Sequence, residues 1–242
     1  MPLLADIHNH ALFGLDDGAA DLDESVRMLE ISYAQGVRLL CLTPHCNPHL
    51  FPRSTRQRAD ENFVQLFEIA REKFPDLTLL QGNEFYIFGS SVDSLREGLC
   101  RPLGESRTLL VEFAPDVLYS ELENSLRAVR SLGYRPLVAH AERYECLLRE
   151  PTRVGELVAM RAAVQVNASS VLASFLSPVG RFVRRLLKEG LVHVIASDGH
   201  GAVRRTPQLL EAYGKVASRY GNAAADALFY KNPRQFVLPE KE

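Results

Sequence analysis

Short apolar runs alternate with amphipathic stretches along most of this chain. The runs are a few residues long, as in Val37–Leu42, which is typical of buried strands. The stretches between them repeat apolar residues every three or four positions, which is typical of helices packed on a sheet. The predicted strands span residues 3–7, 37–42, 77–80, 108–113, 137–139, 164–166 and 191–196.

The predicted helices alternate with these strands. Glycines at 36, 133 and 190 follow the helical pattern and predict three helix ends, since glycine adopts the left-handed conformation common there. Ser120 and Glu123 have the spacing of a capping box and predict the start of a fourth helix. The predicted helices lie near residues 22–33, 63–74, 94–97, 120–129, 151–161, 179–187, 207–220 and 223–230.

About seven strand–helix units in a row indicate an α/β protein with a parallel sheet, which is either closed into a barrel or open. A length of 242 residues suits one barrel or two small domains. The pattern contains no linker, low-complexity segment or clear repeat. We therefore expect residues 1–242 to form a single domain.

Composition and charge exclude several classes of protein. The chain is 46% hydrophobic and 24% charged, which argues against disorder, and its net charge is -2. No dominant basic field is present, so we expect no nucleic-acid partner. No apolar run approaches the ~20 residues of a membrane span. The first ten residues carry no basic leader, so we expect no signal peptide.

The four cysteines form no C-x-x-C pair. A chain of this size does not need disulfides to fold, so we expect reduced thiols in a cytoplasmic protein. Cys41 and Cys46 flank the segment that contains His45, but we interpret them as small buried residues rather than metal ligands.

Histidines and acidic residues follow the predicted strands at their carboxyl ends. In a closed barrel all these ends meet on one face, where such barrels place their active sites, whereas an open sheet would spread them along an edge. Their convergence favours a barrel. The eight residues are His8, His10, His45, Glu84, Glu112, His140, Asp198 and His200.

Imidazole and carboxylate ligands suit divalent metals without any thiolate. His8 and His10 are two positions apart on a strand, so their side chains point to the same side, and Asp6 shares it and could orient a ligand. Asp17 is close enough in sequence to be an outlying ligand, although Asp16-Asp17-Gly18 also has the composition of a turn. His49 and His193 are interpreted as residues outside the site.

Arginines that follow the strand ends are candidates for phosphate binding. Arg143 lies three residues after His140, and Arg204 and Arg205 follow His200. A guanidinium group can hold two phosphate oxygens at once. An ordinary surface position is an equally good reading of each arginine from the sequence alone.

Six motifs occur in order along nearly the whole chain: D-I-H-N-H, T-P-H, G-N-E, V-E-F, A-H-A-E-R-Y and S-D-G-H. Together they resemble the polymerase and histidinol phosphatase (PHP) family, and most of all its bacterial protein-tyrosine-phosphatase branch, which is linked to capsular and exopolysaccharide synthesis. The resemblance implies a distorted (β/α)7 TIM-like barrel. It also implies two or three divalent metal ions, often Mn2+, with Fe or Zn as alternatives.

The resemblance further implies a division of the ligands. His8, His10, Glu84 and Asp198 are similar to the ligands of one metal, with Glu84 bridging to a second. Glu112 and His140 correspond to that second site, and Asp17, His45 and His200 to a third. Arg143 and Arg205 match phosphate-contacting arginines, although Gly201-Ala202-Val203 departs from the family's pattern. The implied partner is a phosphotyrosine protein, a tyrosine autokinase of polysaccharide export.

A phosphatase of this kind would use a water activated between two metals as the nucleophile, with His45, His200 or a metal-bound water as the candidate proton donor. None of the four cysteines has an arginine at the sixth following position, so the C-x5-R loop of cysteine phosphatases is absent. A phosphatase of small metabolites such as histidinol phosphate, a phosphodiesterase, and a metal-binding regulatory module remain alternatives. An amide hydrolase is disfavoured because Glu112, and not lysine, ends the fourth strand.

Overall fold

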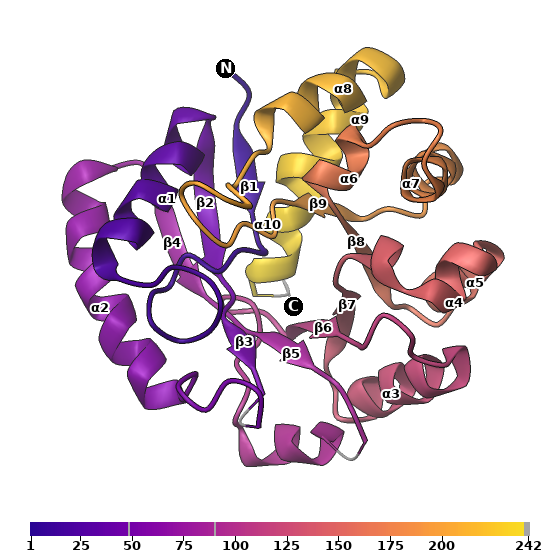
Figure 1. The fold of residues 1–242 in the computed structure, drawn as a ribbon, viewed down its shortest axis with the longest axis horizontal. Helices are drawn as coiled ribbons and strands as arrows, with labels where there is room; N and C mark the ends of the chain where they lie inside the picture. Colours follow the sequence, from indigo (N-terminus) through magenta and orange to yellow (C-terminus); the bar gives the residue numbers. More distant parts are fainter. Residues whose placement is uncertain (48, 90, 240–242) are drawn as a thin grey trace.

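The computed structural model describes residues 1–47, 49–89 and 91–239, and only the backbone of residues 93 and 94. Parallel strands lie in the middle of the molecule and helices surround them (Figure 1). The architecture is the predicted TIM-like barrel, in a distorted form in which the strands belong to two sheets. One sheet has the order β1-β2-β4 and the other β3-β5-β6-β7-β8-β9. The strands are β1 (Leu4–Asp6), β2 (Val37–Leu42), β3 (His45–Cys46), β4 (Thr78–Gln81), β5 (Glu84–Tyr86), β6 (Thr108–Glu112), β7 (Arg135–Val138), β8 (Ala163–Asn167) and β9 (Val194–Ala196).

The segments that follow β9 and β1 pair with each other and close the barrel. Asn9 and Gly199 form an isolated parallel bridge, and the main-chain N–H of His10 donates to the carbonyl of Gly199 at 2.8 Å. The N–H of Asp198 donates to the carbonyl of His8 at 2.8 Å. These bonds hold the two histidine-bearing loops side by side.

The second and third predicted strands are each broken in two, which the sequence pattern did not predict. Pro44 separates β2 from β3, because proline has no N–H to continue a ladder. Gly82 and Asn83 separate β4 from β5, and a Cβ at Gly82 would lie 2.7 Å from Cδ2 of Leu103. The short strands β3 and β5 begin with His45 and Glu84, so each break re-aims a candidate ligand.

The predicted helical segments occur in the expected order, whereas the short helices at residues 145–149, 168–172 and 232–237 were not predicted. Residues 36, 133 and 190 have positive φ angles at helix ends, as expected. The predicted capping box is wrong, because α3 begins one residue earlier with Leu118 as its N-cap and no side-chain cap bond. The α-helices are α1 (Leu22–Ala34), α2 (Arg56–Lys73), α3 (Tyr119–Ser131), α4 (Glu145–Arg149), α5 (Thr152–Ala159), α6 (Ala168–Leu172), α7 (Pro178–Glu189), α8 (Leu210–Tyr220), α9 (Asn222–Asp226) and α10 (Asn232–Val237). Ser91–Glu97 and Ala141–Arg143 are 3-10 helices, and Ala227–Lys231 forms a π-helical turn.

The barrel has two hydrophobic cores. The larger lies between strands and helices, and the smaller joins residues inside the barrel, such as Ile7 and Leu137, to Phe236 and Val237 of α10. The main-chain N–H of Glu105, three residues before β6, donates to the carbonyl of Val237 at 2.9 Å. Helix α10 therefore covers the amino-terminal ends of the strands.

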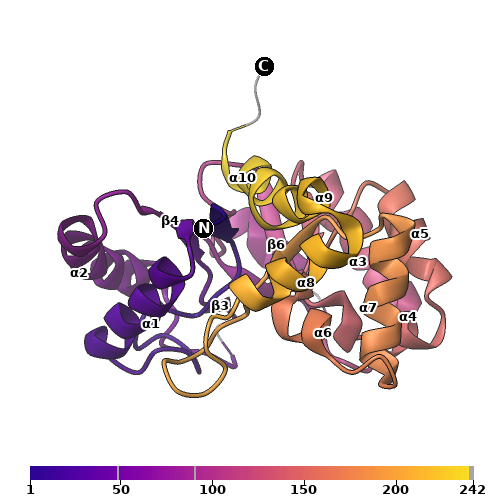
Figure 2. The ribbon, with the colours of Figure 1, turned by 90° about the horizontal axis from the view of Figure 1, so that it is seen from above.

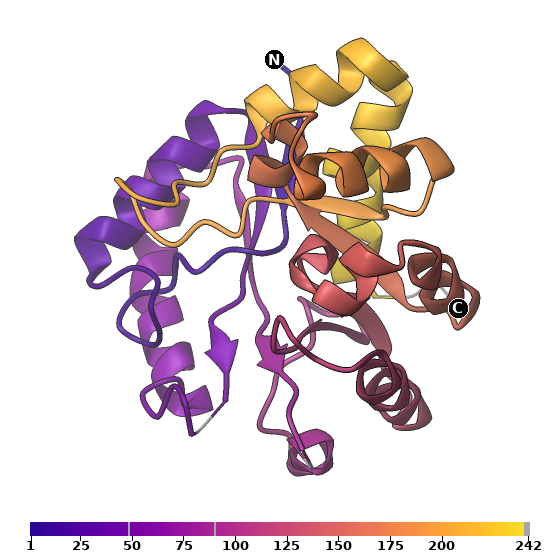
Figure 3. The ribbon, with the colours of Figure 1, turned by 45° about the vertical axis from the view of Figure 1, so that its right-hand side comes forward.

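Seen from above, α8, α9 and α10 lie between the side of the molecule that carries α1 and α2 and the side that carries α5 and α7 (Figure 2). Helices α1 and α2, coloured indigo to purple, flank one side of the strands, and α3, α5 and α7 lie on the other (Figures 1 and 3). Among the described residues, every helix is too short or too polar to cross a lipid bilayer.

The expectation of four reduced thiols is wrong for two of them. Cys46 and Cys100 form a disulfide across 54 positions of sequence, with their Cα atoms 5.9 Å apart. The sequence spacing does not predict this pair. Strand β3 pairs with β5, and reciprocal hydrogen bonds between Asn83, just before β5, and the main chain of Arg101 bring the segment of Cys100 to the same place. Cys41 and Cys146 are free, and Cys41 is buried.

Candidate metal centre

The carboxyl ends of the strands bring the nine predicted ligands to one face of the barrel. His8 and His10 lie two and four residues after the end of β1, Glu112 ends β6, and His140 lies two residues after the end of β7. The ninth residue, Asp17, lies in the loop between β1 and α1 and is about half exposed. Neighbouring donor atoms lie within 4.8 Å of one another in four groups: His10, Asp17, His45 and His200; His8, His10 and Asp198; His8, Glu84 and His140; His45, Glu84 and Glu112.

Glu84 lies at the middle of the cluster and is almost fully buried. Its Oε1 is 3.2 Å from Nε2 of His8 and 2.9 Å from Nε2 of His140. Its Oε2 is 3.2 Å from Nε2 of His10 and 3.1 Å from Nδ1 of His45. One carboxylate thus faces four imidazoles, an arrangement suited to a ligand shared between two metals.

Many of these donor atoms are buried without a hydrogen bond. A buried polar atom without a partner costs free energy, so a cluster of them calls for an explanation. A set of imidazole nitrogens and carboxylate oxygens directed at shared space is what divalent cations require. The residues present therefore fit metal ions. The unpartnered atoms of the cluster are Nε2 of His8, His10 and His200, Nδ1 of His45 and His140, Oε2 of Glu84 and Oδ1 of Asp198.

The electrostatics of the cluster agree with this fit. Burial lowers the pKa of His140, but hydrogen bonding to Glu112 and Glu84 outweighs burial and raises that pKa to about 9. Burial raises the pKa of Glu84, yet the histidines around it hold that pKa well below its ordinary value. The carboxylates thus attract positive charge, which a proton or a metal ion can supply in competition.

Two side chains that the sequence analysis did not select orient the histidines. Oε1 of Gln165 lies 3.1 Å from Nδ1 of His8, and Oδ2 of Asp16 lies 2.7 Å from Nδ1 of His10. Partners of this kind determine which ring nitrogen stays free to bind a metal. The sequence analysis interpreted Asp16 as part of a turn and gave Gln165 no role.

Asp6 was expected to orient a ligand, and its Oδ1 accepts a hydrogen bond from the main-chain N–H of His8 at 3.5 Å rather than from the imidazole ring. Its carboxylate also accepts hydrogen bonds from the main-chain N–H of Ser197 at 3.0 Å and the Ser197 hydroxyl at 2.5 Å. Burial raises the pKa of Asp6 to about 6, against these hydrogen bonds. Asp6 therefore ties β1 to the β9 loop rather than touching a histidine ring.

Three residues of this face have strained backbones. His140, Asp198 and Arg205 have φ angles of 30°, 53° and 50°, in the left-handed region that residues with a Cβ seldom adopt. Such strain persists only where the surroundings impose it, and it concentrates at functional sites. The fold therefore holds His140 and Asp198 in place at an energetic cost.

Both predicted phosphate-binding arginines reach the cluster. Nη2 of Arg143 donates to Oδ2 of Asp198 at 2.5 Å, and Nη2 of Arg205 donates to the same oxygen at 3.2 Å. Each side chain is a little over 40% exposed, so it can also meet a ligand from solvent. Arg204 and Arg205 line a cavity of about 490 Å³ that also reaches Asp17 and His200.

An aromatic surface borders the centre. The ring of Phe51 stacks on His45, with 4.4 Å between the centroids and 12° between the planes. His49 is exposed in the same loop, and its ring lies edge-on to Phe88 at 6.3 Å. His193 lies at the start of β9, near the opposite end of the barrel, where its Nδ1 accepts a hydrogen bond from the N–H of Val164 at 3.2 Å.

The chain is similar over its whole length to known phosphatases. It is 34% identical over 242 residues to the tyrosine-protein phosphatase CpsB of Streptococcus pneumoniae, covering 98% of this chain and 99% of that protein. It is 30% identical over 222 residues to the tyrosine-protein phosphatase YwqE of Bacillus subtilis strain 168, covering 90% of this chain and 86% of that one.

Solved structures agree with the fold. A chain from the crystal structures of YwqE from B. subtilis and CpsB from S. pneumoniae, described as unique metal-dependent tyrosine phosphatases, superposes with a TM-score of 0.85 at 28% identity, covering 97% of this chain and 94% of that one. A phosphotriesterase homology protein from Escherichia coli gives a TM-score of 0.60 at 12% identity, covering 98% of each chain, and supports the barrel fold alone. The family model for capsular polysaccharide synthesis proteins, CpsB/CapC, matches residues 4–238. The chain belongs to the CpsB/CapC family of capsular polysaccharide synthesis.

Proposed function

We propose that this protein is a metal-dependent protein-tyrosine phosphatase that acts in capsular or exopolysaccharide synthesis. The observation that carries the proposal is the buried cluster of imidazole and carboxylate atoms without hydrogen-bond partners. Relatives that bear the name tyrosine-protein phosphatase match this chain over nearly their full length. Residues 1–242 form, in this proposal, one catalytic domain.

The nine predicted ligands hold two or three divalent metal ions, with Mn2+ as the proposed metal. The geometry groups His8, His10 and Asp198 around one position, and His10 also reaches the position bordered by Asp17 and His200. Glu84 belongs to two groups, which supports a bridging role. When bound, the metals supply Lewis acidity and lower the pKa of a coordinated water.

Arg143 and Arg205 bind the phosphoryl group. Both guanidinium groups already lie at the edge of the cluster on Oδ2 of Asp198, and both retain N–H groups that face solvent. A transferring phosphoryl group spreads negative charge over three oxygens, and planar guanidinium groups can hold these in pairs. The two arginines therefore position the phosphorus above the metal-binding side chains.

The cysteines do not supply a nucleophile. Burial raises the pKa of Cys41 to about 12, so its thiolate does not form near neutral pH. Cys46 and Cys100 are joined in a disulfide, and burial also raises the pKa of Cys146. The chemistry consequently depends on the histidine and carboxylate cluster.

The residues that border the metal centre suit an aryl phosphate as substrate. A tyrosyl leaving group has a pKa of about 10 and departs with less help from an acid than an alkoxide does. The ring of Phe51, stacked on His45, offers an apolar face beside the cluster for the substrate's aromatic ring. The proposed proton donor to the departing oxygen is His45 or His200, whichever of the two does not coordinate a metal ion.

The proposed substrate is a phosphotyrosine protein, specifically a tyrosine autokinase of polysaccharide export, and the proposed location is the cytoplasm. Cytoplasmic thiols are usually reduced, so the Cys46–Cys100 pair makes the location testable. Counting free thiols in protein extracted under acid-quenched conditions measures whether this cysteine pair is oxidised in the cell.

The proposed function is tested by metal analysis and by turnover. Purified protein is analysed for bound metals, stripped with a chelator, and assayed on a phosphotyrosyl peptide after each metal is restored. We expect activity to vanish on stripping and to return best with Mn2+. His140→Ala should abolish turnover, whereas His193→Ala removes an imidazole at the other end of the barrel and should not. Full activity after exhaustive metal removal would falsify the proposal.

Substrate class is tested in the same assay. The kcat/KM values for a phosphotyrosyl peptide, histidinol phosphate and a phosphodiester are compared. We expect the peptide to be preferred, since the site combines an aromatic border with two arginines. Preference for histidinol phosphate would instead assign a small-molecule phosphatase, and no turnover of any ester by metal-loaded protein would assign a regulatory module.

A further inference from the structure

The cavity beside the metal centre contains an arginine that the proposed reaction does not use. Arg204 and Arg205 both line this space of about 490 Å³, together with Asp17 and His200 of the metal centre. Arg205 donates to Oδ2 of Asp198. Arg204, in contrast, forms no hydrogen bond or ion pair within the part of the chain that the structure describes. Its guanidinium group is therefore a cation with free donors next to the site.

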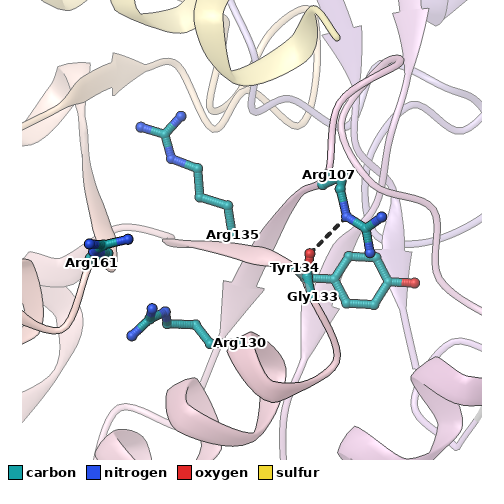
Figure 4. A pocket seen from close by; sticks show the side chains of 6 residues that line it. All are labelled: Arg107, Arg130, Gly133, Tyr134, Arg135 and Arg161. Atoms are coloured by element: carbon teal, nitrogen blue, oxygen red, sulfur yellow. Dashed lines mark hydrogen bonds between the residues drawn. The ribbon is translucent and has the colours of Figure 1, made fainter. Parts of the chain in front are cut away.

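Arginines at the other end of the barrel differ in this respect. Figure 4 shows Arg107, whose Nε donates to the carbonyl of Gly133 at 2.8 Å. Nη1 of Arg130 donates to the carbonyl of Met160 at 2.6 Å. Arg107 directly precedes β6, so it lies at the amino-terminal ends of the strands, on the face opposite the histidines. These guanidinium groups stabilise the local main chain, and they lie too far from the metal centre to meet the same substrate.

The acidic groups of the cavity are already engaged by other partners. Oε2 of Glu24 accepts a hydrogen bond from the N–H of Ala20 at 3.0 Å, and Oε1 accepts one from the N–H of Ala202 at 3.3 Å. Oδ2 of Asp17 lies 3.7 Å from Nη1 of Arg205. Neither carboxylate pairs with Arg204, so its charge is available to a ligand.

The main chain that carries Arg204 is held in place. The N–H of His200 donates to the carbonyl of Arg205 at 2.8 Å and closes the loop. A Cβ at Gly201 would lie 3.0 Å from the carbonyl oxygen of Arg204, so a larger residue there would crowd the loop. The side chain of Val203 is 88% exposed, and that of Arg204 is also exposed. The loop thus presents a free guanidinium group to solvent from a fixed position.

The position of Arg204 suits a residue close to the phosphotyrosine in the substrate sequence. Arg204 is the neighbour of Arg205, which binds the phosphoryl group in the proposed function, and consecutive Cα atoms are about 3.8 Å apart. An extended peptide advances by a similar distance, roughly 3.3 Å per residue. A phosphotyrosine side chain is long, so the flanking residues stay near the mouth of the cavity. A side chain one or two positions away can therefore meet Arg204.

We propose that Arg204 is a specificity-determining residue that binds the carboxylate of an acidic side chain one or two positions from the phosphotyrosine. The proposal rests on the proposed function, in which Arg143 and Arg205 hold the phosphoryl group. A guanidinium group binds a carboxylate through two parallel hydrogen bonds. An exposed ion pair contributes modestly to binding, so the expected discrimination is about two- to fivefold.

The test compares phosphotyrosyl peptides that carry glutamate or glutamine at each of the two positions on either side of the phosphotyrosine. For the metal-loaded full chain at low salt, we expect kcat/KM to be about two- to fivefold higher for glutamate than for glutamine at one or more of these positions. Arg204→Gln should bring this ratio to about one, and Arg204→Glu should favour lysine there instead. Arg149→Gln removes an exposed charge from α4 and should keep the wild-type ratio.

A binding measurement separates this proposal from the phosphatase activity itself. The same peptides, with a non-hydrolysable phosphonate in place of the phosphate, are titrated calorimetrically into each protein. Tighter binding of the glutamate peptide by wild type, lost in Arg204→Gln, would support the role of Arg204 even if no ester were turned over. Equal binding of both peptides by wild type, or the wild-type preference retained in Arg204→Gln, would overturn it. So would an equal loss of kcat/KM for p-nitrophenyl phosphate and for the glutamate peptide, because that result would place Arg204 on the phosphoryl group.

Discussion

Oε1 of Gln165 lies 3.1 Å from Nδ1 of His8, and both groups are fully buried. The same oxygen accepts a hydrogen bond from the main-chain N–H of His140 at 2.7 Å, and the amide nitrogen donates to Oδ1 of Asn167 at 2.8 Å. The amide orientation that satisfies these bonds makes Nδ1 of His8 the donor. Nε2 of His8 is then left with a lone pair that faces Glu84 and Asp198.

Gln165→Leu should weaken metal binding by about 10- to 100-fold, because removing the partner of a ligating histidine releases its ring orientation. Metal affinity is measured by competition with a chromogenic chelator, and secondary structure is followed by circular dichroism. Gln165→Glu keeps an acceptor for His8 and should recover part of the affinity. Unchanged affinity in Gln165→Leu would mean that the strand ends alone orient His8.

Arg143→Gln should lower kcat/KM for a phosphotyrosyl peptide by about 10- to 100-fold, because one charged hydrogen-bond donor to the phosphoryl group is lost. Steady-state kinetics on metal-loaded enzyme provide the measurement. Arg149→Gln is the matched control, since Arg149 is exposed on α4 and pairs only with Glu145 among the described ion pairs. Equal effects of the two substitutions would contradict a role for Arg143 in binding phosphate.

His193 should make the protein less stable at mildly acidic pH. Its pKa is lowered from the ordinary value of 6.5 by burial and then by Arg135, so the unfolded chain takes up this proton first as the pH falls. The contribution of neutral His193 to the free energy of unfolding is complete above pH 6.5. It decreases below that pH, by at most about 1.4 kcal/mol per pH unit for one proton. Protonation of Nδ1 would also break its hydrogen bond from Val164.

Urea unfolding between pH 5 and 8 measures this dependence. His193→Asn keeps an acceptor but cannot titrate, so its curve should be flatter than that of wild type. The same change at the exposed His49 serves as the control and should preserve the wild-type slope. Parallel curves for wild type and His193→Asn would remove His193 as the cause.

Cys46→Ser with Cys100→Ser should destabilise the protein. Opening a loop of 54 residues costs up to about 4 kcal/mol in the chain-entropy description. Denaturant unfolding with and without a reductant gives the measurement. Wild type in reductant should approach the double variant, whereas Cys146→Ser should unfold like wild type without reductant. No effect of reductant on wild type would show that the pair does not contribute to stability.

The sequence pattern predicted most of the elements in their order and identified the candidate ligands that the fold brings together. Apolar runs such as Val37–Leu42 predicted strands, and glycines predicted helix ends, because both depend on residues close in the chain. Residues such as His140 and Glu112 were selected because strand ends in a barrel converge wherever they occur in sequence. Periodicity alone could not reveal β3 or β5, which are two and three residues long.

Only the tertiary structure decided which groups face one another. The contact of Gln165 with His8 and the joining of Cys46 to Cys100 link positions far apart in the chain, and each depends on how the strands and the segments beside them pack. Local sequence thus determines the elements and their chemistry. Hydrogen-bond partners, in contrast, depend on atomic positions to within about an ångström, and only the packing of the whole chain determines these positions.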